Sequence, residues 1–405
     1  MTRPVRAARG KQRPRTRRLG SATWRKLARM AAAGTLAAGT GVLTAALFMP
    51  AAASASSSQT WTGGGDGTSW SDGMNWASNS VPSNGDSVTI PAVNFPARTV
   101  VTGMPAGTQL QDLTMTDASL SGGDVTVAGN FSWSVSQGFE ILASPLTVAG
   151  DASFSGAGEA DIQDPMTFEG TTEFNGPGLM SIQDSGQAIT NDGTLMVAPN
   201  AVVRASVASV CCVSPDTFSN GGTLNVAAGT GTATVTNMQL SNGGTVKVNG
   251  GTLAINTLGY KQTAGSTQLA GGSITAQKQM NISKGTLSGF GTITGSVLNG
   301  GTVAPSTTGG VLKITGAYNQ QSAGTLSSVI TGTTPGTKFG QLSVGGKATL
   351  AGTLKVNTGN GFVPGHGQSF SVLLYHTRSG MFGTLSGSPA YTVSYTATAA
   401  NVVYP

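Results

Sequence analysis

The chain has 405 residues, of which only 9% are charged, with 60 glycines and two cysteines. Its formal net charge is +6, yet 11 of its 22 Lys and Arg residues lie within residues 1–29, so the remaining 11 basic and 16 acidic residues give −5. The positive charge therefore belongs to the N-terminal leader, which excludes a nucleic-acid-binding class for the rest of the chain. Hydrophobic residues beyond the leader recur with a period of two, which indicates strands rather than helices.

Residues 1–55 have the layout of a secretory signal. A basic run precedes an uncharged stretch from Met30 to Met49, and small-residue cleavage sites follow up to Ala55. Arg17 and Arg18 leave both the twin-arginine and the general secretory route open. An uncleaved anchor is the alternative, because the apolar run is about long enough to cross a bilayer. We expect cleavage, no stable membrane insertion, and an extracellular or loosely surface-associated protein.

Residues 56–98 are expected to form an N-terminal cap. Trp61, Trp70 and Trp76 fall close together in this segment. A solenoid exposes its apolar core and its strand edges at its ends, and bulky indoles could cover one end. The alternative interpretation is a stacking platform for the sugar rings of a glycan.

Residues 99–287 are predicted to form solenoid coils. A phrase of the form Asn-Gly-Gly-Thr-Leu, with small variations, recurs at 191–195, 220–224, 242–246, 249–253 and 299–303. Each copy is a tight turn that leads into a strand, and spacings of roughly 20–30 residues are typical of solenoids. The segment Ile162-Gln-Asp164 also returns as Ile182-Gln-Asp184, which predicts that these residues stack one coil apart.

An acidic patch lies between residues 159 and 192, with Asp161, Asp164 and Asp184 as its candidate site residues. Stacked carboxylates could remain a solvated face, bind calcium, or act on a polysaccharide. The sequence contains no calcium-loop motif, so we assign no metal and no cofactor. The two histidines do not complete a catalytic set, because His366 fits a turn and His376 has no acidic neighbour in sequence.

Cys211 and Cys212 are adjacent and are the only cysteines. A vicinal disulfide would need a distorted turn, since neighbouring residues on a strand point to opposite faces. A vicinal disulfide, two free thiols and intermolecular pairing all remain open.

Residues 288–405 contain two telling segments, Ser288-Gly-Phe-Gly-Thr-Ile-Thr-Gly-Ser-Val-Leu-Asn-Gly-Gly-Thr-Val-Ala-Pro305 and Gly361-Phe-Val-Pro-Gly-His-Gly-Gln-Ser-Phe-Ser-Val-Leu373. They resemble the β-helix stem repeats of bacterial autotransporter passengers and related secreted surface proteins. The resemblance implies an all-β fold, a right-handed parallel β-helix, which adhesins, lyases and inert stalks share. An autotransporter would continue into a membrane barrel, whereas this chain stops at Pro405, so we expect release or loose wall retention.

Charge is segregated along the chain. Every acidic residue lies between Asp66 and Asp216, and residues 217–405 hold eight lysines and Arg378 but no acid. If the coils stack in sequence order, opposite ends carry opposite charge, which predicts weak head-to-tail self-association at low salt.

These observations together predict a secreted structural or adhesive surface protein that contacts glycan or cell wall. One alternative is a polysaccharide-active hydrolase or lyase that uses the acids of 159–192. The other is a wall-associated stalk without a ligand. The incomplete catalytic set favours a non-enzymatic role.

Overall fold

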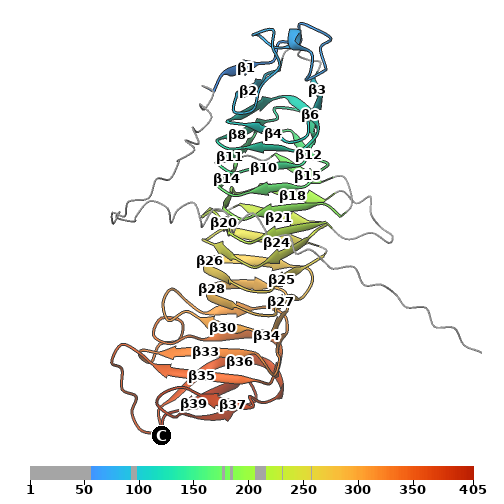
Figure 1. The fold of residues 1–405 in the computed structure, drawn as a ribbon. Coiled ribbons are helices and arrows are strands. Elements are labelled where there is room, and N and C mark those ends of the chain that lie inside the picture. The colour runs from blue at the N-terminus through green and yellow to red at the C-terminus, as the bar shows by residue number, and fades with distance from the viewer. Residues whose placement is uncertain are drawn as a thin grey trace, which may run out of the picture. The chain divides into compact units, whose positions relative to one another are not determined.

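The computed structural model describes residues 56–92, 98–175, 178–182, 186–205, 216–229, 231–256 and 258–405. Residues 54–405 form one compact unit. Its described part is a parallel β-solenoid whose coils stack one on another (Figure 1). The strand register assigns successive strands in turn to three faces, which are called sheets 1 to 3 below. The all-β parallel solenoid expected from the sequence is confirmed.

Sheet 1 begins inside the segment expected to be the cap, because its first two strands already pair in parallel. It consists of β1 (Ser58–Thr60), β2 (Ser87–Ile90), β5 (Leu113–Thr116), β8 (Phe131–Ser134), β11 (Ala152–Ser155), β14 (Thr171–Asn175), β17 (Thr194–Val197), β20 (Thr223–Val226), β23 (Thr245–Val248), the first parts of β26 (Ser266–Ala276) and β28 (Thr286–Thr294), β30 (Thr302–Pro305), β33 (Thr325–Ile330), β35 (Thr353–Thr358) and β37 (Thr384–Ser386).

Sheet 2 takes the next strand of each coil and includes the second parts of β26 and β28. Its other strands are β3 (Thr99–Met104), β6 (Ala118–Gly122), β9 (Phe139–Ala143), β12 (Glu159–Ile162), β15 (Leu179–Ile182), β18 (Val202–Ala205), β21 (Thr232–Thr236), β24 (Thr252–Asn256), β31 (Leu312–Ile314), and the first parts of β34 (Leu342–Leu350) and β36 (Ser369–Gly380).

Sheet 3 completes each coil and ends with the second parts of β34 and β36. Its other strands are β4 (Thr108–Leu110), β7 (Val125–Val127), β10 (Leu146–Val148), β13 (Met166–Phe168), β16 (Ala188–Asn191), β19 (Thr217–Asn220), β22 (Gln239–Asn242), β25 (Tyr260–Gln262), β27 (Met280–Ile282), β29 (Val297–Asn299) and β32 (Tyr318–Gln320).

The two ends of the stack depart from this pattern. Near the N-terminus, the short 3-10 helix η1 (Gly73–Asn75) lies in the turn between β1 and β2. At the other end, β39 (Ala399–Val403) pairs antiparallel with both β36 and β38 (Thr392–Tyr395). This antiparallel pairing covers one edge of β36, a common way of blocking further strand addition.

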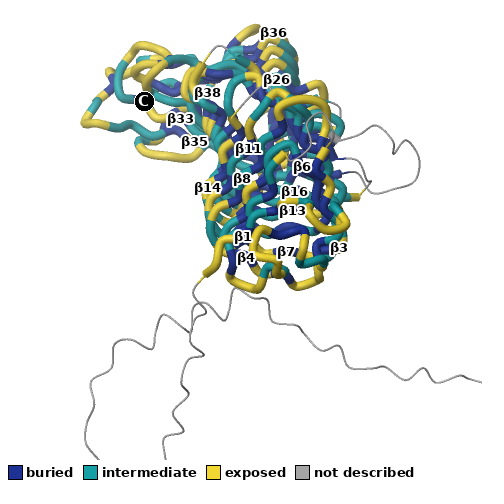
Figure 2. The backbone as a smooth tube through the Cα atoms, turned by 90° about the horizontal axis from the view of Figure 1, so that it is seen from above, coloured by how far each residue is buried: buried dark blue, intermediate teal, exposed yellow. Residues whose placement is uncertain are grey.

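The core fills the inside of the coils because side chains alternate along each strand. In β20, Leu224 and Val226 are each 1% exposed, whereas the residues between and before them are half-buried. Figure 2 shows this mixture of buried and less buried positions along the coils. The 20-residue echo is also confirmed as a coil length, because Ile162 pairs with Ile182.

A column of buried amides joins the coils at the end of sheet 3. Asn191, Asn220 and Asn242 are at most 1% exposed, and each is the first residue of a repeated phrase. Asn191 Nδ2 donates to Asn220 Oδ1 at 2.7 Å, and Asn220 Nδ2 donates to Asn242 Oδ1 at 2.7 Å. Asn242 continues the column to Gln262 at 3.5 Å. The phrase therefore supplies an internal hydrogen-bonded stack as well as a turn.

The repeated phrase occupies two different corners. At 220–224 it links β19 of sheet 3 to β20 of sheet 1, whereas the identical phrase at 249–253 links β23 of sheet 1 to β24 of sheet 2. Asn249 accordingly stands outside the column, is half-buried, and donates to Asn225 Oδ1 at 2.8 Å.

Glycine allows the coils to approach closely at the first of these corners. A Cβ on Gly222 would lie 2.0 Å from the carbonyl oxygen of Gly193, and one on Gly244 would lie 2.1 Å from that of Gly222. No side chain fits at such separations, so the third residue of the phrase at 220–224 and at 242–246 has to be glycine.

Candidate functional site

The three N-terminal tryptophans pack on one another. The Trp61 and Trp76 ring centroids lie 5.0 Å apart at 86°, and those of Trp70 and Trp76 lie 4.9 Å apart at 73°. Each residue is 1% exposed, and Trp76 Nε1 donates to the Trp70 carbonyl oxygen at 2.9 Å. Edge-to-face packing of this kind buries the ring faces that a sugar would need. The arrangement favours the capping interpretation over the glycan platform.

Carboxylates in the first half of the solenoid hold backbone amides of neighbouring coils. Asp112 accepts from the Asn130 amide at 2.7 Å, and Asp151 accepts from the Thr171 amide at 2.9 Å. In the cap, Asp66 accepts from the Ser69 and Thr68 amides, and hydrogen bonds from Ser69, with those from Thr68 and Asn75, hold its pKa well below the usual range. Part of the acidic charge therefore has a structural role.

Asp86 also has a lowered pKa, although it is less exposed than Asp66. Burial alone would raise the pKa of Asp86, but hydrogen bonds from Ser57 and Ser83 outweigh burial and lower it. The Ser57 hydroxyl donates to Asp86 Oδ1 at 2.6 Å, and the Ser83 amide donates to Oδ2 at 2.8 Å. This carboxylate ties Ser57, the residue before β1, to the turn before β2.

The predicted acidic patch is only partly described. Asp161 lies on β12, is 3% exposed, and pairs with Ser181 of β15. Asp164 lies in the following turn and is half-buried. Asp184 lies outside the described residues, as do Cys211 and Cys212, so the expected stacking of Asp164 over Asp184 and the state of the cysteine pair stay predictions. Glu159, at the start of β12, forms an ion pair with Arg204, whose Nη2 lies 3.2 Å from Glu159 Oε1.

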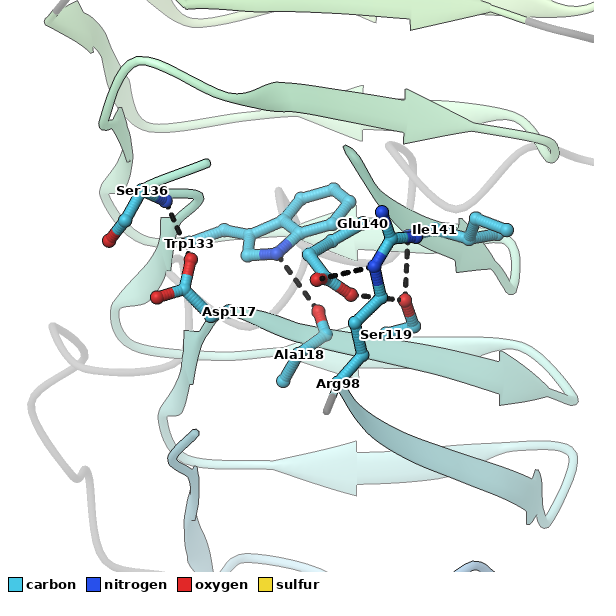
Figure 3. Close-up of polar contacts among 8 residues, drawn as sticks. All are labelled: Arg98, Asp117, Ala118, Ser119, Trp133, Ser136, Glu140 and Ile141. Atoms are coloured by element: carbon cyan, nitrogen blue, oxygen red, sulfur yellow. Dashed lines mark hydrogen bonds and ion pairs between the residues drawn. The ribbon is translucent and has the colours of Figure 1, made fainter. Parts of the chain in front are cut away.

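A buried carboxylate that sequence reasoning missed lies on β9 (Figure 3). Glu140 is 2% exposed, accepts a 2.6 Å hydrogen bond from the Ser119 hydroxyl, and pairs with Arg98 Nε at 3.5 Å. Ser119 Oγ also accepts from the Ile141 amide at 2.9 Å, which fixes the hydroxyl between adjacent coils. Burial raises the pKa of Glu140, against the opposing effects of Ser119 and Arg98, and the nearby Asp117 raises it further.

Arg98 is held between this carboxylate and an aromatic ring. Its guanidinium carbon lies 3.9 Å from the centroid of the Phe139 ring, a cation–π geometry. The Arg98 side chain remains 38% exposed, so the cation is fixed in position yet open to solvent.

A hollow of about 300 Å³ adjoins these groups on the outer face of β3, β6 and β9. Val100, which lines the hollow, is 41% exposed, and Phe139, which packs on Arg98 of the lining, is 45% exposed. Asp161 pairs with Ile141, so the predicted acid lies on the strand that borders the hollow. The residues that line the hollow are Arg98, Val100, Val101, Ser119, Leu120, Ser121, Ile141, Ala143 and Gln163.

A concave surface that combines apolar side chains with a few fixed polar groups is the usual form of a small-ligand or sugar site. The sequence signal for this one was the spacing of Arg98, Ser119 and Glu140 at intervals of 21 residues, close to the coil length. Within the described ranges, no three His, Cys, Asp or Glu side chains gather as a metal centre would require. No helix in the described parts of the chain is long and apolar enough to span a membrane.

No family model matches the chain, and no curated protein matches it.

Proposed function

We propose that this protein is a secreted, non-enzymatic surface protein with a structural and adhesive role, and that it contacts glycan or cell wall through the hollow beside Glu140. The leader of residues 1–55 and the resemblance to passenger stem repeats support secretion and surface location. The solenoid itself supports a structural role, because stacked coils form an extended scaffold on which sites can be placed.

The observation that carries the adhesive part is the fixed Arg98 beside exposed Phe139 and Val100. A pyranose ring has an apolar C–H face and a polar rim. The apolar face can pack on Phe139 and Val100, while the guanidinium and the Gln163 amide can hydrogen-bond to the rim. Glu140 then acts as a positioning residue, since its buried carboxylate is already engaged by Ser119 and Arg98.

The test is a glycan and cell-wall binding screen with residues 56–405. We expect Phe139→Ala to weaken the observed binding by about tenfold, since loss of a stacking contact costs about 1.4 kcal/mol. Leu258→Ala is the matched control, because Leu258 is 39% exposed and lies between β24 and β25, whereas Phe139 packs on Arg98 of the hollow's lining. Equal affinity for both variants would place the contact elsewhere, and no binding to any glycan would favour the ligand-free stalk.

The second candidate is a polysaccharide-active enzyme, and one observation favours it. Glu140, whose pKa is raised, and Asp161 lie on adjacent strands beside the same hollow. Glycoside hydrolysis uses two carboxyl groups, one of which serves as the acid and has a raised pKa. Polysaccharide turnover that is lost in Glu140→Gln and in Asp161→Asn would establish this candidate.

A further inference from the structure

Three exposed lysines lie on or beside two adjacent strands of sheet 3. Lys261 is the central residue of β25, and it pairs with Asn281 at the centre of β27. Lys278 and Lys284 flank β27 on either side, three residues from Asn281 in each direction. All three lysines are exposed. β25 and β27 follow one another down the stack (Figure 1).

Strand geometry bounds the spacing of these residues along the backbone. Lys278 and Lys284 lie in the bends on either side of β27, and an extended chain of six residues spans at most about 20 Å, while Lys261 lies on the neighbouring strand, about 4.8 Å from Asn281. Asn281 lies between them, and its Oδ1 accepts from the Ser283 hydroxyl at 3.0 Å. The face thus presents three cations and hydrogen-bonding groups over a width that suits a linear polymer.

No Asp or Glu follows Asp216 in the sequence, so these lysines have no acidic side chain as a neighbour in their own half of the solenoid. Asp216 itself is 6% exposed, accepts from the Gln187 amide at 3.0 Å, and precedes β19, which lies two coils from β25. The two ion pairs found in the described ranges join Arg98 to Glu140 and Arg204 to Glu159, and neither involves a lysine. The positive charge of this face is therefore not neutralised locally.

We propose that the face formed by Lys261, Lys278 and Lys284 binds a linear polyanion that carries phosphate or carboxylate groups. The ammonium group is a compact point charge that suits both kinds of anion. The inference is independent of the hollow beside Glu140, and it adds a second contact with an anionic wall polymer to the proposed adhesive function.

The experiment measures binding of residues 56–405 to immobilised polyphosphate and to immobilised polygalacturonate over a range of salt concentrations. We expect salt-sensitive binding, and we expect the triple variant K261Q/K278Q/K284Q to bind at least about tenfold more weakly. If each lost contact contributes about 0.7 to the slope of log K against log salt, the slope should fall by about 2. The polymer that is retained at the higher salt concentration identifies the anionic group.

A control triple, K313Q/K347Q/K355Q, removes the same charge from lysines that are also exposed but lie on other parts of the stack. We expect it to change the affinity by less than about threefold. Equal weakening by both triples would show diffuse attraction and would overturn the site, as would no binding of the wild type to either polymer. Sedimentation without polymer checks the remaining case: if the protein self-associates and the first triple abolishes that association, the face binds a second copy instead.

Discussion

Replacing Asn220 by Ala should destabilise the solenoid far more than the same change at Asn249, although both residues begin the identical phrase Asn-Gly-Gly-Thr-Leu. Asn220 is 1% exposed, accepts from Asn191 Nδ2, and donates to Asn242 Oδ1 at 2.7 Å and to the Thr245 carbonyl at 3.1 Å. Its loss removes about three buried hydrogen bonds at about 1 kcal/mol each, which gives about 3 kcal/mol.

Asn249 is half-buried, and the structure records for its side chain a hydrogen bond to Asn225 Oδ1 at 2.8 Å. Asn249→Ala should therefore lower the free energy of unfolding by no more than about 1 kcal/mol. Denaturant unfolding of residues 56–405 measures the two losses. Amide hydrogen exchange then locates them, because exchange reports the opening of separate regions. Equal losses in the two variants would refute the claim that the buried amide column joins the coils.

Other predictions follow from the packing, charge and leader of the chain. Gly244→Ala should lower the free energy of unfolding by about 3 kcal/mol or more, because the added Cβ would meet the Gly222 carbonyl oxygen. A Cβ on Gly243 would have the Asn220 carbonyl oxygen as its nearest neighbour, at 3.8 Å, so Gly243→Ala should change that free energy by no more than about 0.5 kcal/mol in the same assay. The lowered pKa values of Asp66 and Asp86 contribute stability that is present above the usual Asp pKa of about 3.9 and is lost as pH falls through the lowered values. Hydrogen exchange in acid should therefore show the first coils opening before residues 217–405, and simultaneous opening would contradict this prediction. Protein recovered from the medium should begin near Ser56, and an intact leader on membrane-bound protein would instead identify an anchor. The charge segregation predicts weak head-to-tail association at low ionic strength that salt reverses, and a monomer at both salt concentrations by sedimentation at micromolar protein would exclude it.

The parallel solenoid could be predicted because its coils repeat in the sequence. The echo of Ile162 in Ile182 gave a coil length of 20 residues, which the strand register confirms. The tryptophan cluster pointed to an end of the stack for a different reason, because Trp61, Trp70 and Trp76 stand outside the repeated phrases.

The amide column and the hollow could not be predicted in the same way. Asparagine in a turn phrase is compatible with an exposed turn, and only the register shows that Asn191, Asn220 and Asn242 point into the core while Asn249 does not. Glu140 meets an arginine 42 residues earlier, so their pairing depends on how two coils stack. The 21-residue spacing of Arg98, Ser119 and Glu140 matches a coil length, but the local sequence between Phe139 and Ile141 gives no reason to single out Glu140.

The most direct test of the proposed function uses a glycan or cell-wall preparation that retains residues 56–405. Bound protein and newly formed reducing ends are measured in the same sample over a long incubation. The proposed adhesive function predicts that protein is retained without an increase in reducing ends, and that Phe139→Ala reduces retention. An increase in reducing ends that disappears in Glu140→Gln and in Asp161→Asn would contradict it and would identify the protein as an enzyme.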